Sequence, residues 1–479
     1  MKRLISTLVP CLALGSPGAA QPTQEALPET TPPAGESTAA QAQSASTVLP
    51  DSTTWAAPEQ NTTAPTGFLP PSFDTSYVPP YERPTTQPLP PRSPNPDFGT
   101  GAFGSGPELP LPAAPRPGAV PPAAGSRDPL PLSWGIITFH PHVSYQMVYG
   151  SGLLSGPGRE ENSFQHTLSP GMTFNIGPRW RLDYTPSLKF YSSEGYEDTL
   201  DHAVSLNGSA GSAGWLFTLG HAYRSSSDAL IETASQTSQD THSTGLGASR
   251  SLTDTTTLEL GLAQSLRFAE DYTDSYTWST TDWLDKQLRP DFAVAVGINA
   301  AYQLMDPGTD MTSERLLGRV RGRALNKLGY SVEGGVEFRQ FLDSDAPMKV
   351  SPTVNGSLSY QVFEPTTIGV FASHDIGTSY YTDQFTETTR VGGSLSQRLL
   401  GKIHLSVSGG YSFMKYSSTL ASDTVVREDE TPNFQAGLST RLLRRGSVSV
   451  FYSWSQNASG LAGYSYDSNQ IGFQLGYAL

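Results

Sequence analysis

The segment GLGASRSLTDTTTLELGLAQSLRFA, Gly245–Ala269, contains two stretches in which apolar residues occupy alternate positions. In its second half, Leu258, Leu260 and Leu262 alternate with glutamate, glycine and alanine. Successive side chains of a β-strand point to opposite faces, so this alternation predicts strands with one apolar and one polar face. A short polar turn, Thr253–Thr255, separates the two halves. The segment therefore predicts an antiparallel hairpin.

The same pattern returns in three later segments: LSYQVFEPTTIGVFAS, SQRLLGKIHLSVSGGYSF and STRLLRRGSVSVFYSW. In each, a strand of about a dozen residues meets a short turn and a second strand follows. Strands in soluble sheets usually have about five or six residues, whereas tilted strands that cross a membrane have about ten. The repeated hairpin therefore favours an all-β transmembrane antiparallel β-barrel. A soluble propeller or solenoid is the alternative, but no repeat of fixed length recurs.

The number of strands follows from the short turns. We expect turns centred at Pro178, Gly211–Gly214, Asp254, Arg289–Pro290, Asn326–Lys327, Glu364–Pro365, Gly401 and Arg444–Arg445. Eight hairpins, a first strand near Trp134–Tyr149 and a last strand near Gln470–Leu479 predict about 18 strands, within a range of 16–18. Proline cannot donate a hydrogen bond to a neighbouring strand, so Pro170 and Pro186 predict bulges or shifted boundaries.

Two polar stretches separate some of these hairpins: SSSDALIETASQTSQDTHS and SSTLASDTVVREDETPN. Outer-membrane barrels alternate short periplasmic turns with longer outer loops. We therefore expect both stretches to form long loops.

The last strand is expected to close the barrel. In DSNQIGFQLGYAL, Asp467–Leu479, one face carries Ile471, Phe473, Leu475 and Tyr477, and the other carries Gly472 and Gln474. The first face is expected to contact outer-membrane lipid and the second the lumen. Pairing with the first strand would give every backbone N–H and C=O group in the hydrocarbon core of the membrane a hydrogen-bond partner. The aromatic pattern also resembles the C-terminal signal that the outer-membrane assembly machinery reads, although the chain ends in leucine.

The N-terminal residues predict export. Lys2 and Arg3 precede a short apolar run and then small residues, which is the order of a signal peptide at residues 1–20. The sole cysteine, Cys11, lies within that peptide. Residues 21–130 are rich in Pro, Ala, Ser and Thr, and proline prevents helices and sheets from propagating. They predict a disordered periplasmic arm, either a spacer or a docking arm, before a barrel at residues 131–479.

The sequence favours neither an enzyme nor a nucleic-acid-binding protein. The formal net charge of −14 disfavours nucleic acid, which needs a basic surface. No nucleophile elbow, phosphate-binding loop or HExxH spacing is present, so we expect no catalytic residues, no metal and no cofactor. His140 and His142 share a strand face but have no third ligand nearby. The tryptophans predict girdles at the membrane interfaces.

Charged residues that could line a pore concentrate in SERLLGRVRGRALNKLGYSVEGGVEFRQF, Ser313–Phe341. The residues expected to face the lumen are Arg315, Arg319, Arg321, Arg323, Glu333, Glu337 and Arg339, because their parity is opposite to that of Leu316, Val320, Val332 and Val336. Opposite charges on neighbouring strands attract. The patch could stiffen the wall, or it could form a constriction that selects anionic or hydroxyl-rich solutes.

The pattern around LLGKIHLSVSGGYS, the EPTTIGVF turn and the SYYTDQF segment at Ser379–Phe385 resembles a bacterial outer-membrane beta-barrel porin family. That family includes barrels encoded in exopolysaccharide operons. The resemblance covers residues 131–479 and implies a channel in the outer membrane of a Gram-negative bacterium, for polysaccharide or small hydrophilic solutes. The alternative is a structural or surface-interaction barrel, tethered to periplasmic partners by its arm, that transports nothing.

Overall fold

The computed structural model describes residues 132–152, 162–325, 327–342, 344–420, 425–443 and 445–478. The predicted signal peptide and arm lie outside these residues. All described residues belong to one compact unit. No helix in these described ranges is long and apolar enough to cross a membrane.

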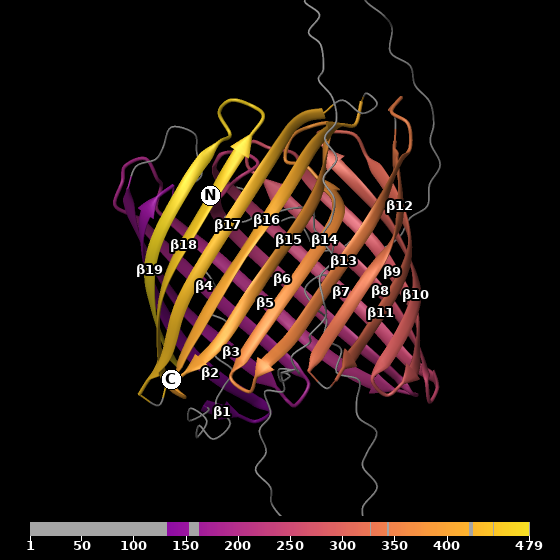
Figure 1. The fold of residues 1–479 in the computed structure, drawn as a ribbon, viewed down its shortest axis with the longest axis horizontal. Coiled ribbons are helices and arrows are strands. Elements are labelled where there is room, and N and C mark those ends of the chain that lie inside the picture. The colour runs from indigo at the N-terminus through magenta and orange to yellow at the C-terminus, as the bar shows by residue number, and fades with distance from the viewer. Residues whose placement is uncertain are drawn as a thin grey trace, which may run out of the picture. The chain divides into compact units, whose positions relative to one another are not determined.

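The described residues form one antiparallel sheet that closes on itself (Figure 1). Its strands are β1 (Leu132–Trp134), β2 (Ile137–Ser151), β3 (Ser163–Ile176), β4 (Trp180–Tyr191), β5 (Thr199–Ser212), β6 (Trp215–Leu230), β7 (Ser235–Thr253), β8 (Thr256–Ala269), β9 (Asp274–Arg289), β10 (Phe292–Asp306), β11 (Met311–Ala324), β12 (Leu328–Phe341), β13 (Lys349–Phe363), β14 (Thr366–Thr378), β15 (Gln384–Leu399), β16 (Ile403–Ser418), β17 (Val425–Leu442), β18 (Gly446–Ser459) and β19 (Tyr466–Ala478). Each strand from β2 to β19 pairs with the next, which makes a ring of 18 strands. The prediction of about 18 strands is confirmed.

Pairing between β19 and β2 closes the ring. Ile471 lies opposite Tyr149, and Leu475 lies opposite Tyr145. The predicted closure by the terminal strand is thus confirmed. The first barrel strand begins at Ile137 rather than near Trp134, because Trp134 belongs to β1, a three-residue strand paired with the start of β2.

The alternation seen in the sequence separates the two faces of the wall. In the hairpin formed by β7 and β8, Leu246, Leu260 and Leu262 are 49%, 39% and 53% exposed on the outer face. On β19, Ile471 and Leu475 are likewise exposed. The buried apolar residues of the described ranges form no single central core. Buried apolar side chains instead form small clusters on the inner side of the wall, such as Trp283, Ala295 and Leu317.

One end of the barrel, called the turn end, carries the connections of two or three residues after β3, β5, β7, β9, β11, β13, β15 and β17. Each of the eight predicted turns lies at or beside one of these connections. Leu325, Leu400 and Leu443 adopt left-handed backbone conformations there, with φ between 50° and 58°, and are strongly exposed. A left-handed conformation is unusual for a bulky residue.

The opposite end, called the loop end, differs from expectation. The first polar stretch was predicted to be a long loop, but β6 and β7 extend through it and leave only residues 231–234 between them. The second is also mostly strand, because β17 begins at Val425. The prediction of two long loops is wrong. Serine and threonine are compatible with strands that continue beyond an apolar belt.

Pro170 and Pro186 cause neither a bulge nor a shift in register. The β3–β4 pairing stops at Leu168 opposite Leu188 and resumes in the same register at Met172 opposite Tyr184. The two prolines lie opposite each other within that gap. On the inner face a hydrogen bond of 2.8 Å between the hydroxyls of Ser169 and Ser187 bridges the gap.

Candidate functional site

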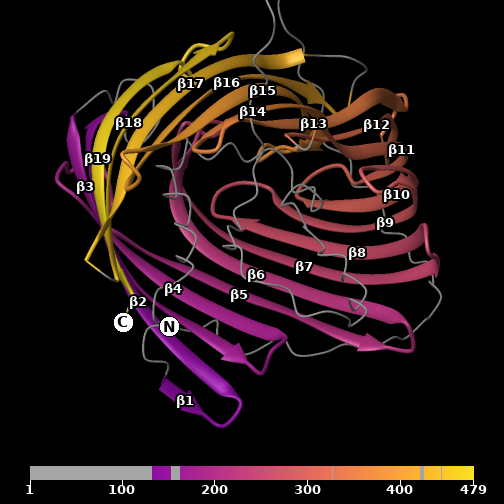
Figure 2. The ribbon, with the colours of Figure 1, turned by 60° about the horizontal axis from the view of Figure 1, so that its bottom comes forward.

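Near the loop end, β14 separates from β13, while β15 stays paired with β16 as far as Gln384 opposite Ser418. Figure 2 shows β14, β15 and β16 running side by side in the wall. The β13–β14 pairing ends at Val354 opposite His374, but β14 and β15 continue as a pair to Thr378 opposite Phe385. The tip of this hairpin packs against the inside of the neighbouring wall, where Ile376 and Phe385 contact Met305 and Met311. Burial of the tip within the barrel explains why Ser379 and Tyr380 are only 0% and 2% exposed.

A second hairpin tip, between β6 and β7, also extends beyond its neighbours. The β5–β6 pairing ends at His202 opposite Ser225, and the β7–β8 pairing begins only at Gln239. Between these points β6 and β7 pair only with each other as far as Leu230 opposite Ser235. Leu230 and the connecting residue Glu232 are buried.

The two tips meet although they belong to nearly opposite sides of the ring. Six strands separate them in one direction and eight in the other. Glu232 Oε1 accepts hydrogen bonds from the Ser379 hydroxyl and from the backbone N–H of Tyr380, at 2.5 and 2.7 Å. The Tyr380 hydroxyl donates to Gln239 at 2.7 Å. These contacts place a bridge across the loop end.

Two arginines hold this bridge from neighbouring strands. Arg267 of β8 donates to the Ser379 carbonyl at 2.7 Å and lies over the Tyr380 ring at 3.8 Å. Arg427 of β17 donates to the Glu232 carbonyl at 3.0 Å and lies between the Tyr416 and Tyr464 rings. An arginine over an aromatic ring is attracted by the ring's quadrupole, and burial strengthens the attraction. We call Glu232, Arg267, Ser379, Tyr380 and Arg427 the mouth bridge.

Glu232 is the titratable group at the centre of the mouth bridge. Burial raises the pKa of its carboxyl above the ordinary value, while hydrogen bonds from Ser379 and Tyr380 and the charges of Arg267 and Arg427 oppose the shift. Desolvation disfavours the charged form of a carboxyl group. In the bridged arrangement Glu232 therefore binds its proton more tightly than an exposed glutamate does.

Below the mouth bridge lies the patch predicted on β11 and β12. Arg315 is opposite Glu337 in the register and donates to it at 2.7 Å. Arg339 pairs with the same carboxylate at 2.7 Å. Arg339 and Glu337 are 0% and 1% exposed, so Glu337 lies buried between two guanidinium groups.

Arg339 also links the patch to the β14–β15 tip. It donates to the carbonyl of Ile376 at 3.1 Å and to Gln303 of β10 at 3.0 Å. A buried charge is tolerated when ion pairing and hydrogen bonds satisfy it. Arg339 therefore anchors the tip to the wall through four strands, β10, β11, β12 and β14.

Arg319 and Arg321 form ion pairs with residues of β8 and β9 rather than with the glutamates of their own hairpin. Glu333 lies opposite Arg319 in the register. The ion pairs of Arg319 are nevertheless formed with Glu259 of β8 and Asp285 of β9, at 2.8 and 3.4 Å, and its guanidinium lies over the Trp283 ring. Arg321 pairs with Asp285 at 2.9 Å.

Arg323 is exposed beside the turn end. The predicted strand-closing residues Ile471, Phe473, Leu475 and Tyr477 lie on the outer face of β19, away from both the patch and the mouth bridge.

Sequence reasoning missed the mouth bridge and the partners on β8 and β9. The parity of Glu259 and Asp285, opposite to that of Leu258 and Leu284, indicated the inner face. No sequence signal indicated that Ser379 and Glu232 meet, because they are 147 residues apart.

No group of three or more histidine, cysteine, aspartate or glutamate side chains in the described ranges could hold a metal ion. His142 instead lies beside Gly171, where an added Cβ would be 2.2 Å from the imidazole.

No family model matches this chain, and no curated protein has a similar sequence. Among solved structures, a bacterial polysaccharide outer membrane secretin is 8% identical with a TM-score of 0.32, and covers 71% of this chain and 98% of its own. Pseudomonas aeruginosa OpdO is 9% identical with a TM-score of 0.41, covering 71% and 97%. P. aeruginosa OpdL is 12% identical with a TM-score of 0.39, covering 72% and 98%. These similarities are too low to assign a solute or a function, and the barrel assignment rests on the strand pairing of this chain.

Proposed function

We propose that this protein is an outer-membrane channel for hydrophilic solutes, with its turn end in the periplasm and its loop end outside. The supporting observation is a closed 18-stranded ring that exposes apolar side chains outward and carries paired charges inward. A polar interior inside an apolar band is the arrangement of barrels that conduct.

The solute follows from the chemistry of the inner wall. Arginines and carboxylates of β8, β9, β11 and β12 face the same interior, so a passing molecule meets donors and acceptors of both signs. Charged rings of this kind set selectivity in pores. Hydroxyl-rich solutes, including polysaccharide chains, can use both donors and acceptors, and we propose them as the substrate class.

In the arrangement described, the mouth bridge narrows the loop end. Passage of a polysaccharide chain would require the β14–β15 tip to move. We therefore propose a channel with low basal conductance whose opening depends on the contacts of Ser379 and Tyr380 with Glu232.

Planar-bilayer recording tests this proposal. The variant replaces Ser379–Asp383 with a short glycine linker, and the control inserts the same linker beside Gly401 at the turn end. We expect the first change to raise single-channel conductance several-fold and the second to leave it near the wild-type value. Absence of conductance from both variants in folded protein would favour the alternative, a structural barrel that transports nothing.

A further inference from the structure

The outer face of the barrel has two sectors of different chemistry. On β10 to β19 most of its exposed large residues are apolar, including Val296, Leu316, Val336, Val370, Leu438 and Val450. His374 and Thr389, hydrogen-bonded at 2.7 Å, form a polar pair there on β14 and β15. On β3 to β9 the same face also carries polar side chains, namely His166, His202, His221, His242, Thr244, Gln264, Thr280 and Asp282. Each of these has the parity of exposed apolar residues on its own strand, such as Phe164, Leu200, Phe217, Leu246, Leu262 and Trp278.

Asp282 is the least expected member of this polar sector. It lies on β9 with Leu260 of β8 and Ile298 of β10 as its cross-strand neighbours. The Thr280 hydroxyl donates to it at 3.2 Å. A carboxylate that faces lipid is costly, and charged residues at membrane depth usually face protein or water. Its position therefore points to a polar neighbour on the outside of the barrel.

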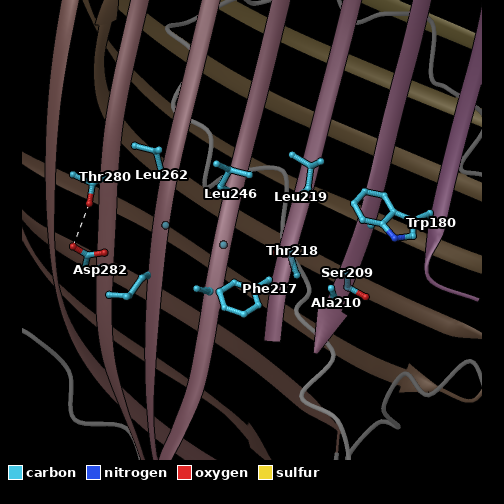
Figure 3. A pocket seen from close by; sticks show the side chains of 15 residues that line it. Trp180, Ser209, Ala210, Phe217, Thr218, Leu219, Leu246, Leu262, Thr280 and Asp282 are labelled. Atoms are coloured by element: carbon cyan, nitrogen blue, oxygen red, sulfur yellow. Dashed lines mark hydrogen bonds between the residues drawn. The ribbon is translucent and has the colours of Figure 1, made fainter. Parts of the chain in front are cut away.

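Two shallow grooves flank Asp282. One has a volume of about 570 Å³ and runs over β4 to β9, where Ala210, Ala248 and Thr280 leave space between Phe217 and Leu262. Figure 3 shows Ala210, Phe217, Leu262 and Thr280 along neighbouring strands, with Asp282 at one edge. The second groove, of about 660 Å³, lies over β8 to β12 and is lined by Val296, Ile298 and Leu316. Asp282 lines both grooves.

Two histidines lie on strands that the first groove crosses, His221 on β6 and His242 on β7. His221 hydrogen-bonds Thr244 through Nδ1 at 2.9 Å, and its ring centroid lies 6.1 Å from that of His242. Neighbouring strands are about 4.8 Å apart, so β6 and β9, which are three spacings apart, are separated by roughly 14 Å. One face thus holds imidazoles, a carboxylate and a depression lined with small residues.

We propose that this sector is the contact surface for a second copy of the same chain within the membrane. A two-fold contact places the same patch of both copies face to face, so that residue i of one meets residue j of the other and the reverse. In such a contact the imidazoles of one copy can donate hydrogen bonds to Asp282 of the other. The protruding Phe217 and Leu246 of one copy can likewise pack into the depression at Ala248 of the other. Six strands at about 4.8 Å spacing give a face roughly 25 Å wide, enough for an interface of standard size.

The inference rests on the membrane placement proposed above but not on conduction. Cross-linking in isolated outer membranes tests it. Cys11 is the chain's sole natural cysteine, so Ala248→Cys and Ala436→Cys are each made with Cys11→Ala. Ala436 is the matched control because it has the outer-face parity of exposed Phe434 and Leu438 on β17, in the β10 to β19 sector.

With a short bis-maleimide, we expect Ala248→Cys to give a product of twice the chain's mass and Ala436→Cys to give none above background. Adding Asp282→Leu to Ala248→Cys should lower the cross-linked fraction several-fold, although removal of a lipid-facing charge should not harm folding. Equal cross-linking at both sites, a product of another mass, or no loss with Asp282→Leu would overturn the second-copy assignment. Recovery in the soluble fraction would instead refute the membrane placement.

Discussion

The two ends of the barrel contain the same strands but differ in how the strand ends are covered. At the turn end, Leu400 and Leu443 are 90% and 84% exposed, and connections have two or three residues. At the loop end, Ser379 and Tyr380 are 0% and 2% exposed because hairpin tips bridge the interior. The conformation of a short turn depends on residues adjacent in sequence, whereas the mouth bridge depends on contacts between strands on different sides of the ring.

Charge separates the ends as well. The described connections of the loop end contain nine aspartates and glutamates and no lysine or arginine. Those of the turn end contain four basic and three acidic residues. An acidic rim concentrates cations and repels anions, so the arginines of β11 would meet an anion only after it has passed the mouth.

The largest expected difference between the ends concerns buried charge. Arg339→Met removes one partner of Glu337 and the anchor of the β14–β15 tip, and breaking such a buried pair costs about 3–5 kcal/mol. Arg323→Met, near the turn end, should change the free energy of unfolding by no more than about 0.5 kcal/mol. Urea unfolding in lipid, followed by tryptophan fluorescence, measures both. Equal losses would mean that the loop end is no better packed than the turn end.

A charge introduced on the outer face should destabilise the barrel more than a charge introduced on the inner face. Phe473→Arg on β19 places a charge in the apolar band and should cost about 2–4 kcal/mol. Gln474→Arg faces inward and should cost less. Gly472 also faces inward, but an added Cβ would lie 2.4 Å from the Phe451 ring, so even alanine should be harmful there. The fraction of heat-resistant folded protein reports all three variants. Equal damage from Phe473→Arg and Gln474→Arg would mean that the faces are reversed.

Glu232 gives a pH test of the loop end alone. Its pKa is raised in the bridged arrangement, so bridging is favoured at low pH and is weakened as pH rises through that pKa. Arg267 and Arg427 supply the positive charges that face this carboxyl. Wild-type conductance should therefore increase with pH.

Two variants of Glu232 separate its charge from its hydrogen bonds. Glu232→Gln retains an acceptor for Ser379 and Tyr380 and should stay closed at all pH values, whereas Glu232→Ala should weaken the bridge by about 1–3 kcal/mol. Glu194→Gln, an exposed position on the β4–β5 connection, is the control. A pH response that survives in Glu232→Gln would assign the titration to another group.

The smallest effect is expected from the arginines of β11. Changing Arg319, Arg321 and Arg323 together to Gln leaves Glu259 and Asp285 without their ion-pair partners, which should shift ion selectivity toward cations without unfolding the barrel. The reversal potential in a salt gradient measures the shift. Since Arg323 is exposed and lies by the turn end, Arg323→Gln should give only a small part of it. An unchanged reversal potential in the triple variant would leave the patch with a wall-stiffening role.

Much of the wall could be predicted from the sequence, because the alternation of residues within each strand shows which side chains share a face. The parity of Leu258, Leu260 and Leu262 decides which face is exposed, and the turn at Asp254 decides where the chain reverses. The pairing of Arg315 with Glu337 also followed from a single hairpin. The pairing of Arg319 with Glu259 required the curvature of four neighbouring strands. The contact of Glu232 with Ser379 required β14 to part from β13 and the β6–β7 hairpin to part from β5 and β8. Neither is encoded in a short window of sequence.

The facing prolines of β3 and β4 have a mechanical consequence. Pro170 remains paired with Val143 of β2, and Pro186 with His202 of β5. Between themselves, however, β3 and β4 lack backbone pairing over three residues. Bending stiffness in a cylindrical shell depends on continuous links around its circumference, so a gap in one link acts as a crease. Lateral pressure should flatten the cross-section along the β3–β4 line first, with the Ser169–Ser187 hydrogen bond as its remaining tie on the inner face.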